Sequence, residues 1–441
     1  KRIMSFLPNI VFAILLCIGG GFFIYNIRKL IRNIRLGRPE VVTDHKRKRL
    51  KNMLRIAFGQ QKMLVRPVVA VLHLTVYAGF LIINIELLEI IIDGLTGSHR
   101  IFASLGSWYY YLITAFEGLA LLVIIAVITF WIRRNILKLP RFRKSELQGW
   151  AKKDANNILY AEMVMMSLFL LMNAADTQLQ ALHAPHYVST GAFGISQYIV
   201  PLLQHASVPT LIAIERSCWW LHIIGVLCFL NYLYYSKHLH ILLAFPNTYY
   251  ASIRPLGALK VNPTVTREVK LMLDPTADPF AAQDPTVAPE KFGASDVADL
   301  TWVQLMSAYT CTECGRCTDE CPANLTGKKL SPRTIMMKTR DRLEEVGKNI
   351  DKHGKFEDDG KQLLGDYITA EELWACTTCN ACAEACPVSI SPVSIIMELR
   401  QYSVMEQSAA PTELNAMMTN IENNGAPWAY SQADRAQIVN I

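Results

Sequence analysis

Five long apolar runs constrain this chain more than any other feature of its 441 residues. They lie at about 6–27, 67–92, 107–132, 157–175 and 214–243. Each run is near the ~20 residues that a helix needs to cross a bilayer, and none alternates polar with apolar residues as a barrel strand does. Hydrophobic residues make up 51% of the chain and charged residues only 18%, which excludes a disordered protein, a fibrous protein and an ordinary soluble enzyme. We therefore expect an all-α membrane bundle of five transmembrane helices.

The positive charges predict how these spans are oriented. Residues 28–66 hold thirteen Lys and Arg and residues 133–153 hold eight, whereas 93–106 hold one and 176–213 hold none. Basic connections stay on the cytoplasmic side of a membrane. We therefore expect a multi-pass protein of the bacterial cytoplasmic (inner) membrane, with its N-terminus outside and the chain after residue 244 cytoplasmic. Topology and lipid contact account for the net charge of +7, and no nucleic-acid partner is expected.

Composition divides the chain further. We expect residues 1–244 to form the five-span domain, 245–295 a Pro-rich linker, 296–405 a mostly α-helical cytoplasmic domain, and 406–441 a C-terminal tail. The linker cannot be one continuous helix, because each proline removes a backbone donor. Within the cytoplasmic domain, Ser331 followed by Pro332 predicts a helix start, and Thr369 with Glu372 predicts a capping box.

Eight of the eleven cysteines form two runs with the spacing C-x2-C-x2-C-x3-C-P. Three thiolates on one tight loop reach three corners of a [4Fe–4S] cluster, and the fourth, which starts a helix, ligates the other cluster. A pair of structural zinc sites is the alternative, but zinc has no need of four cysteines and a proline, twice. We assign one cluster to Cys311, Cys314, Cys317 and Cys386, and the second to Cys376, Cys379, Cys382 and Cys321.

Histidines in the apolar runs suggest haem. A bis-imidazole haem needs two neutral histidines on facing helices at the same depth. His73 lies six residues after Pro67 and His240 near the end of the fifth run, both toward the cytoplasmic side, so we expect them to ligate the iron of a haem b. The alternative is a buried hydrogen-bonding histidine and an interfacial one.

His222 is a tentative iron ligand of a second haem. It precedes His240 by eighteen residues, which is five turns of a continuous helix, so the two histidines would share a face. The second apolar run has no histidine at the depth of His222, so a partner would come from elsewhere, or His222 would serve a quinone. Three carboxylates in the second and third runs, Glu86, Glu89 and Glu117, either handle protons beside a quinone or lie shallow and solvated.

These residues carry a resemblance to known families. His73, with His222 and the run Ser236-Lys237-His238-Leu239-His240-Ile241, resembles the cytochrome b gamma subunit of respiratory nitrate reductase. Both cysteine runs, with Trp374-Ala375-Cys376-Thr377-Thr378-Cys379, are similar to the iron–sulfur subunit of heterodisulfide reductase and to the cluster domain of anaerobic glycerol-3-phosphate dehydrogenase. Their fusion resembles membrane Fe–S oxidoreductases of the electron-transfer-flavoprotein:menaquinone oxidoreductase group.

This chain departs from those families in two ways. The gamma-subunit pattern has a second histidine in the second span, which this sequence lacks. Longer fused members carry Cys-rich domains with a Cys-Cys pair after the ferredoxin part, and no such pair precedes Ile441. The resemblance then implies that the catalytic module, either Cys-rich and heterodisulfide reductase-like or a flavoprotein, is a separate cytoplasmic redox subunit.

The resemblance implies an electron-transfer subunit of a respiratory-chain complex, an oxidoreductase that relays electrons between that partner and the quinone pool. Its cofactors would be two [4Fe-4S] clusters and haem b, with menaquinone as the quinone and membrane lipid around the spans. No nicotinamide or flavin fingerprint is visible, since Gly19-Gly20-Gly21 lies in a span, and no catalytic residue is assigned. The alternatives are a membrane anchor or redox-sensing subunit without quinone turnover, and a ferredoxin domain on a haem-free anchor.

Overall fold

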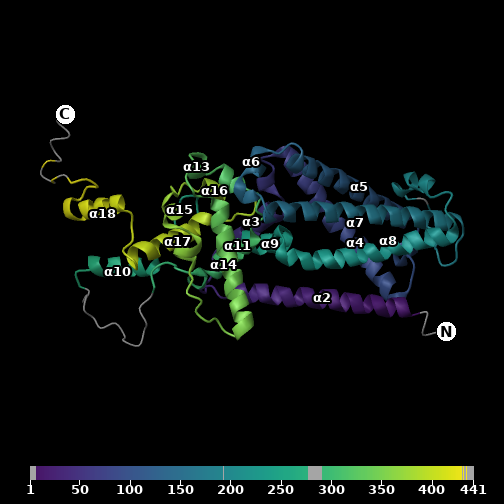
Figure 1. The fold of residues 1–441 in the computed structure, drawn as a ribbon, viewed down its shortest axis with the longest axis horizontal. Coiled ribbons are helices and arrows are strands. Elements are labelled where there is room, and N and C mark those ends of the chain that lie inside the picture. The colour runs from purple at the N-terminus through teal and green to yellow at the C-terminus, as the bar shows by residue number, and fades with distance from the viewer. Residues whose placement is uncertain (1–5, 192, 277–290, 430, 432–433, 435–441) are drawn as a thin grey trace. The chain divides into compact units, whose positions relative to one another are not determined.

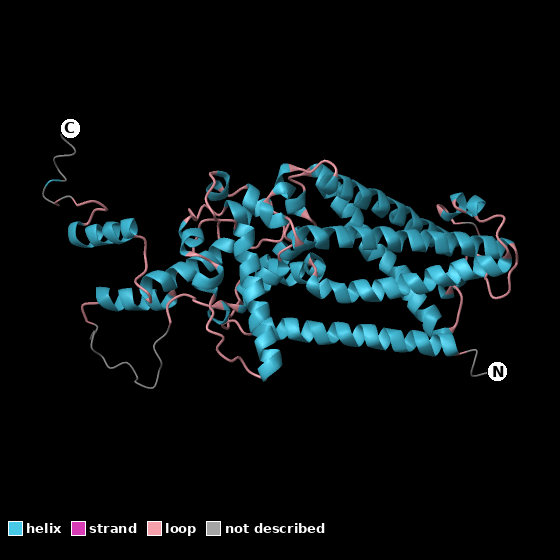
Figure 2. Cartoon of the chain, viewed as in Figure 1, coloured by secondary structure: helices cyan, strands magenta, loops and turns pink. Residues whose placement is uncertain are grey.

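The computed structural model describes residues 6–191, 193–276, 291–429, 431 and 434. Residues 277–290 of the expected linker, and most of the expected tail after 429, lie outside the described residues. Over the described residues the secondary structure consists of helices joined by turns (Figure 2), with two isolated β-bridges, Arg38 to Thr301 and Leu364 to Ile368. The expected all-α fold is confirmed.

The chain divides into two compact units. Unit 1 comprises residues 1–32, 45–249 and 310–315, and unit 2 comprises 33–44, 250–309 and 316–441. The expected bounds at 244, 295 and 405 stay predictions.

Unit 1 contains five helices that are long and apolar enough to cross a membrane (Figure 1), as predicted. They are α2 (Leu7–Ile34), α4 (Pro67–Thr96), α5 (Ser107–Asn135), α7 (Trp150–Ala181) and the segment Val208–Tyr235, which contains α8 (Val208–Tyr232). Helix α5 packs against α4 and α7, and α7 packs against α8. The helices extend beyond the apolar runs, so that polar residues such as Asp154 and Asp176 lie within α7.

Close packing defines the core of unit 1. Phe116 of α5 and Phe169 of α7 are both fully buried in one apolar cluster. A Cβ atom added to Gly79 of α4 would lie 2.5 Å from Val123 of α5. Small residues at such positions let helix backbones approach closely, which is the usual way in which membrane helices associate.

The fifth apolar segment is broken after α8. Ser236 is extended, with φ −107° and ψ 155°, and its hydroxyl accepts a hydrogen bond from the His238 amide at 3.0 Å. Asp154 of α7 accepts from the Tyr232 hydroxyl at 2.7 Å and from the Lys237 amide at 3.0 Å. The assumption of one continuous helix from His222 to His240 was therefore wrong, because the chain restarts as α9 (His240–Tyr250) after the break.

Shorter elements connect the long helices. Those of unit 1 are α3 (Lys46–Met53), η1 (Leu54–Phe58), η2 (Gln61–Met63), η3 (Ile101–Leu105), α6 (Pro140–Arg143), η4 (Ser145–Leu147), η5 (Ser196–Tyr198), η6 (Val200–Leu202), η7 (Leu233–Tyr235) and η8 (Lys237–Leu239).

Unit 2 is built from short helices around one long one. Its elements are α10 (Pro263–Leu273), η9 (Val297–Asp299), α11 (Trp302–Thr310), α12 (Arg316–Asp319), α13 (Pro322–Leu325), α14 (Pro332–His353), η10 (Leu363–Tyr367), α15 (Ala370–Trp374), α16 (Ala381–Ala385), α17 (Pro392–Met405) and α18 (Thr412–Asn424). Both helix starts expected here are confirmed: the Ser331 side chain caps α14, and Thr369 forms a capping box with Glu372.

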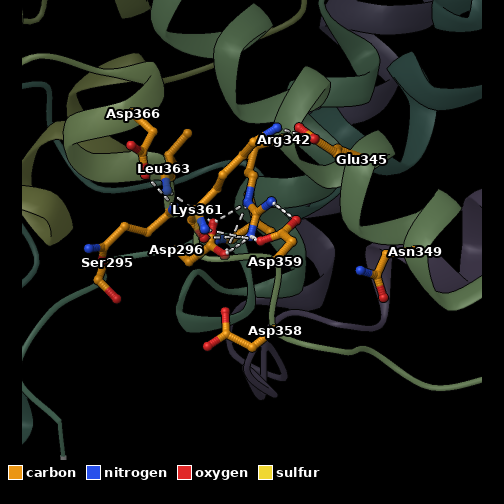
Figure 3. A network of polar contacts seen from close by, with 12 residues as sticks. Ser295, Asp296, Arg342, Glu345, Asn349, Asp358, Asp359, Lys361, Leu363 and Asp366 are labelled. Carbon is orange, nitrogen blue, oxygen red and sulfur yellow. Dashed lines mark hydrogen bonds and ion pairs between the residues drawn. The ribbon is translucent and has the colours of Figure 1, made fainter. Parts of the chain in front are cut away.

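Arg342 of α14 holds the loop that follows this helix (Figure 3). Its fully buried guanidinium forms ion pairs with Asp296 at 2.8 Å and with Asp359 at 2.6 Å, and it donates to the Lys361 carbonyl at 2.7 Å. The Arg342 guanidinium holds the pKa of Asp359 below its usual range. The loop is therefore tied to α14 by charge.

Residues 33–44 belong to unit 2 although they are distant from the rest of it in sequence. Arg38 pairs with Glu398 of α17 at 2.8 Å, and its amide donates to the Leu300 carbonyl at 2.7 Å. The Trp302 ring nitrogen donates to the Glu40 carbonyl at 3.0 Å. The domains expected from the sequence are consecutive segments, so they did not predict that residues 33–44 join unit 2.

Candidate redox sites

The two cysteine loops have positive φ angles at the same two positions. In the first, Glu313 and Gly315 have φ of 50° and 74°, and in the second, Thr378 and Asn380 have φ of 55° and 59°. These residues flank the second cysteine of each run. Gly and Asn tolerate the left-handed region best, so each loop can curl tightly and present its closely spaced thiols to one point.

The fourth cysteines differ between the two runs. Cys321 is the N-cap of α13, with Pro322 at the first helical position, as the spacing predicted. Cys386 instead ends α16, and a turn at Pro387 and Val388 follows it. Its thiol accepts a hydrogen bond from the Ile390 amide at 3.3 Å. The second run therefore reaches its fourth thiol without starting a helix there.

One cavity of unit 2 brings together the four thiols that the spacing assigns to the second cluster. Cys321 from the first run and Cys376, Cys379 and Cys382 from the second line it, with apolar walls that include Leu330, Val393 and Ile396. Among the described residues, no three His, Cys, Asp or Glu side chains converge on a position for a single metal ion. Four thiols around one cavity fit a cuboidal [4Fe–4S] cluster, in which each iron takes one cysteine.

The electrostatics of this cavity follow from its burial. Burial, together with the neighbouring thiols of Cys376 and Cys321, raises the pKa of Cys382 to about 12. Burial also raises the pKa of Cys376. The positive charge of Arg400 partly offsets that rise. The Arg400 guanidinium donates to the carbonyl of Cys376 at 2.6 Å and to that of Leu373 at 2.8 Å. Metal binding at this cavity must therefore displace protons.

The other predicted ligand set is Cys311, Cys314, Cys317 and Cys386. Cys311 and Cys386 are the first thiol of one run and the last of the other. Cys317 lies in α12, which packs against α16 of the second run. The assignment of these four residues to one cluster stays a prediction.

The rings of His73 and His240 lie close together in unit 1. His73 belongs to α4 and His240 begins α9, and their ring centroids are 6.5 Å apart with the planes inclined by 38°. Two imidazoles bonded to one iron from opposite sides have centroids about 6 Å apart, because each bond is roughly 2 Å and each ring adds about 1 Å. The residues present therefore fit a bis-histidine haem, although the assignment itself stays a prediction.

The surroundings of His240 favour a ligand role. Its Nδ1 donates to the Lys237 carbonyl at 2.8 Å, which leaves Nε2 for a metal. Asp154 supports this turn through the Lys237 amide. The His238 ring lies 5.8 Å from that of His240, and its Nδ1 is buried with no hydrogen-bond partner among the described residues. Sequence reasoning gave Asp154 no role, because its contacts depend on how the chain turns after α8.

His222 has a different environment from the His73 and His240 pair. It is buried in α8, its Nδ1 donates to the Met165 carbonyl at 3.0 Å, and the Phe169 ring lies 6.3 Å away. Among the described residues, no second histidine ring packs against it. A role for His222 in a second haem stays a prediction for which the structure brings no partner imidazole.

The three carboxylates singled out in the spans, Glu86, Glu89 and Glu117, are buried in the protein rather than solvated. They lie near Arg100 and near Asp176, two residues to which sequence reasoning gave no role in a site. A signal was available in the sequence, since Arg100 is the lone cation of its loop.

The fold and the cysteine sites together define a class: a helical membrane chain that carries a ferredoxin-type domain. A family model described as a 4Fe-4S dicluster domain matches residues 310–390. No solved structure matches this chain.

Several curated proteins are similar to this chain, including the following three. The probable iron-sulfur-binding oxidoreductase FadF of Bacillus subtilis is 28% identical over 443 residues, covering 94% of this chain and 58% of the relative. The EtfAB:quinone oxidoreductase of Syntrophomonas wolfei is 23% identical over 440 residues, covering 94% and 57%. One subunit of the ferredoxin/F(420)H(2)-dependent CoB-CoM heterodisulfide reductase of Methanosarcina acetivorans is 33% identical over 118 residues, covering 27% and 60%. The chain thus spans less than two thirds of the length of these relatives.

Proposed function

We propose that this chain is the electron-transfer subunit of a quinone-linked oxidoreductase. It relays electrons between a cytoplasmic redox partner and the quinone pool, with menaquinone as the expected quinone. The observation that carries the proposal is the close pair of His73 and His240, 6.5 Å apart, in a chain that also matches a dicluster domain. The similarity to an EtfAB:quinone oxidoreductase supports it.

The chain's own residues hold and tune the redox groups. Four thiols line the cavity of unit 2, and Arg400 adds a positive charge beside Cys376. The hydrogen bond from His240 to the Lys237 carbonyl fixes the ring so that Nε2 can ligate iron. Iron–sulfur clusters and haem supply one-electron transfer when they are bound.

The proposal includes a topology and a partner. The five helices lie in the bacterial inner membrane, with the N-terminus outside and unit 2 in the cytoplasm, as the basic connections predict. The partner is a separate Cys-rich or flavin-containing subunit. Similarity to a heterodisulfide reductase subunit, which is by its name one part of a larger enzyme, supports this arrangement.

Optical spectroscopy tests the haem part of the proposal. In the dithionite-reduced full chain, His73→Ala and His240→Ala should each abolish the b-type α band while the paramagnetic signal of the reduced clusters remains. His205→Ala, which removes an exposed histidine, is the matched control and should change neither signal. An α band that persists in both ligand variants contradicts the assignment.

Electron transfer to added quinone tests the other part of the proposal, the relay between the clusters and the quinone pool. In proteoliposomes, oxidised menaquinone analogue should reoxidise the dithionite-reduced clusters, and His240→Ala should slow this reaction by at least about tenfold because the relay is interrupted. If the clusters never exchange electrons with the quinone pool, the chain is a membrane anchor or redox-sensing subunit instead.

A further inference from the structure

The connection between α5 and α7 lies against the first cysteine loop. Residues 310–315 of that loop belong to unit 1, as do the two helices that the connection joins. Gly315, which follows Cys314, lies beside Leu147 of η4 and Arg141 of α6. A Cβ atom added to Gly315 would lie 2.8 Å from Cδ1 of Leu147 and 3.3 Å from Cγ of Arg141. The loop therefore packs on the connection with no room for a side chain at this position.

The second cysteine loop has a different residue at the equivalent position. Asn380 and Gly315 each follow the second cysteine of their runs, and their φ angles are 59° and 74°. The Asn380 side chain donates a hydrogen bond to the Thr378 carbonyl at 3.1 Å. A left-handed residue in such a loop can thus be asparagine, so the backbone conformation alone does not require glycine in the first loop. The contact with Leu147 accounts for the glycine.

The connection is a fixed support rather than a loose one. Leu147 is 2% exposed, and η4, which contains it, packs against α7. The Leu147 amide donates to the Lys144 carbonyl at 3.0 Å, and the Arg143 guanidinium donates to the Lys138 carbonyl at 2.7 Å. In a close-packed interior a buried side chain moves only by displacing its neighbours. A side chain at Gly315 would therefore push the loop away from Leu147.

Arg141 brings a positive charge to the same place. Its Cδ atom lies 3.6 Å from the position of a Cβ atom at Gly315, and the guanidinium carbon is two bonds further along the side chain. The guanidinium groups of Arg141 and Arg134 lie 4.8 Å and 4.4 Å from the centroid of the Phe142 ring. Arginine keeps its charge in a protein. A cluster with four thiolate ligands is an anion, so a fixed cation near it favours the reduced state.

We propose that residues 140–147 position the first cysteine loop, and that Arg141 raises the reduction potential of the cluster that includes Cys311, the first cluster. Leu147 fills the space that a side chain at Gly315 would need and so fixes the loop. Arg141 is a positioning residue that acts through its charge and not through a bond to iron. The inference rests on the iron–sulfur part of the proposed function and does not depend on haem or quinone.

Paired substitutions in the full chain test the packing. Gly315→Asn should lower the bound iron to about half and remove the paramagnetic signal of the first cluster, because one of two clusters is lost. Adding Leu147→Ala to Gly315→Asn should restore both, since it opens the space beside residue 315. Gly354→Asn is the matched control: Gly354 also has a positive φ, 79°, but its Cβ position is open, so the iron content should not change.

A redox titration followed by electron paramagnetic resonance tests the charge. In Arg141→Gln, the ratio of reduced to oxidised first cluster at a fixed potential should fall about fivefold, the effect of one partly screened charge. Arg141→Lys keeps the charge and should behave as the wild type does. Lys153→Gln removes an exposed charge from the first turns of α7 and should shift neither cluster. Arg400→Gln should shift the other cluster.

The results separate this inference from the proposed function. Wild-type iron content in Gly315→Asn, or a loss that Leu147→Ala does not restore, would overturn the packing role of Leu147. Equal potentials in Arg141→Gln and the wild type, or a shift of the same cluster that Arg400→Gln shifts, would overturn the role of Arg141. The haem band and the electron transfer to quinone decide the rest of the proposed function independently. A wild-type chain that binds no iron would instead contradict the proposed function itself.

Discussion

Arg400 illustrates how one residue can tune a redox centre. Its guanidinium donates to the carbonyls of Leu373 and Cys376 and lies 4.8 Å from the Trp374 ring. A fixed positive charge beside a cluster stabilises the reduced, more negative state. The residue therefore acts on the cluster cavity through its charge and not through a bond to iron.

Arg400→Gln should lower the reduction potential of the cluster that we assign to Cys321, Cys376, Cys379 and Cys382. The shift should be on the order of 50 mV, because one partly screened charge at this range is worth about 1 kcal/mol. A redox titration followed by electron paramagnetic resonance measures it. Arg267→Gln removes an exposed charge of α10 and is the control; equal potentials in all three proteins would contradict the role of Arg400.

The sequence predicted some residues of these sites and not others. The thiols were found because cluster ligation requires fixed cysteine spacings along the chain. Arg400 follows the cysteine run by fourteen residues and carries no spacing signal. Its contact with Cys376 exists only because α17 folds back against α15. The same holds for Asp154, whose importance depends on the turn that it supports.

At the level of elements, ion pairs with Arg342 hold the loop after α14 in place. Asp359 accepts two hydrogen bonds from Arg342, whereas its neighbour Asp358 caps only the Gly360 amide (Figure 3). Because the pKa of Asp359 is lowered in the folded protein, the stability that it contributes is present above the ordinary pKa of aspartate and is lost as the pH falls through the lowered value.

Asp359→Asn should therefore lower the melting temperature of unit 2 at neutral pH. The expected decrease is about 2–4 °C, corresponding to roughly 1 kcal/mol in a domain of this size. The difference from wild type should shrink as the pH falls below about 3.9, where the carboxylate begins to be protonated. Thermal unfolding of the full chain followed by circular dichroism measures both effects. Asp358→Asn should change the melting temperature little. If the difference in melting temperature between wild type and Asp359→Asn grew as the pH fell, the proposed role of the ionised Asp359 would be contradicted.

The break in the chain after α8 is a second feature that depends on contacts between elements. Asp154 holds the extended residue Ser236 and its neighbours through Tyr232 and Lys237, and this turn presents His240 to His73. If His240 holds haem as proposed, Asp154→Ala should leave the clusters intact but lower the haem content or broaden the α band, because His240 loses its support. The ratio of haem to iron measures the effect. Asn156→Ala, in the same helix, is the control, and unchanged haem in Asp154→Ala would show that the turn holds without Asp154.

At the scale of the whole molecule, the distribution of basic residues predicts the orientation in the membrane. The connection before α4 and the connection after it differ greatly in Lys and Arg content. A cysteine placed at Ser104 should react with a membrane-impermeant maleimide in intact cells, and one placed at Gln61 only after permeabilisation. Labelling is compared with the parent chain, which has cysteines of its own. The reverse pattern would invert the proposed topology.

The sequence by itself determined the helical class, the five long apolar helices and the two cysteine loops. Each depends on residues close together in the chain: apolar runs need lipid or protein around them, and cluster ligands need short spacings. Only the tertiary structure decided that Arg400 donates to the Cys376 carbonyl, that the chain breaks before His240, and that Glu86 faces Arg100. Those features depend on contacts between distant residues, because burial, hydrogen-bond partners and charge balance exist only once the helices have packed.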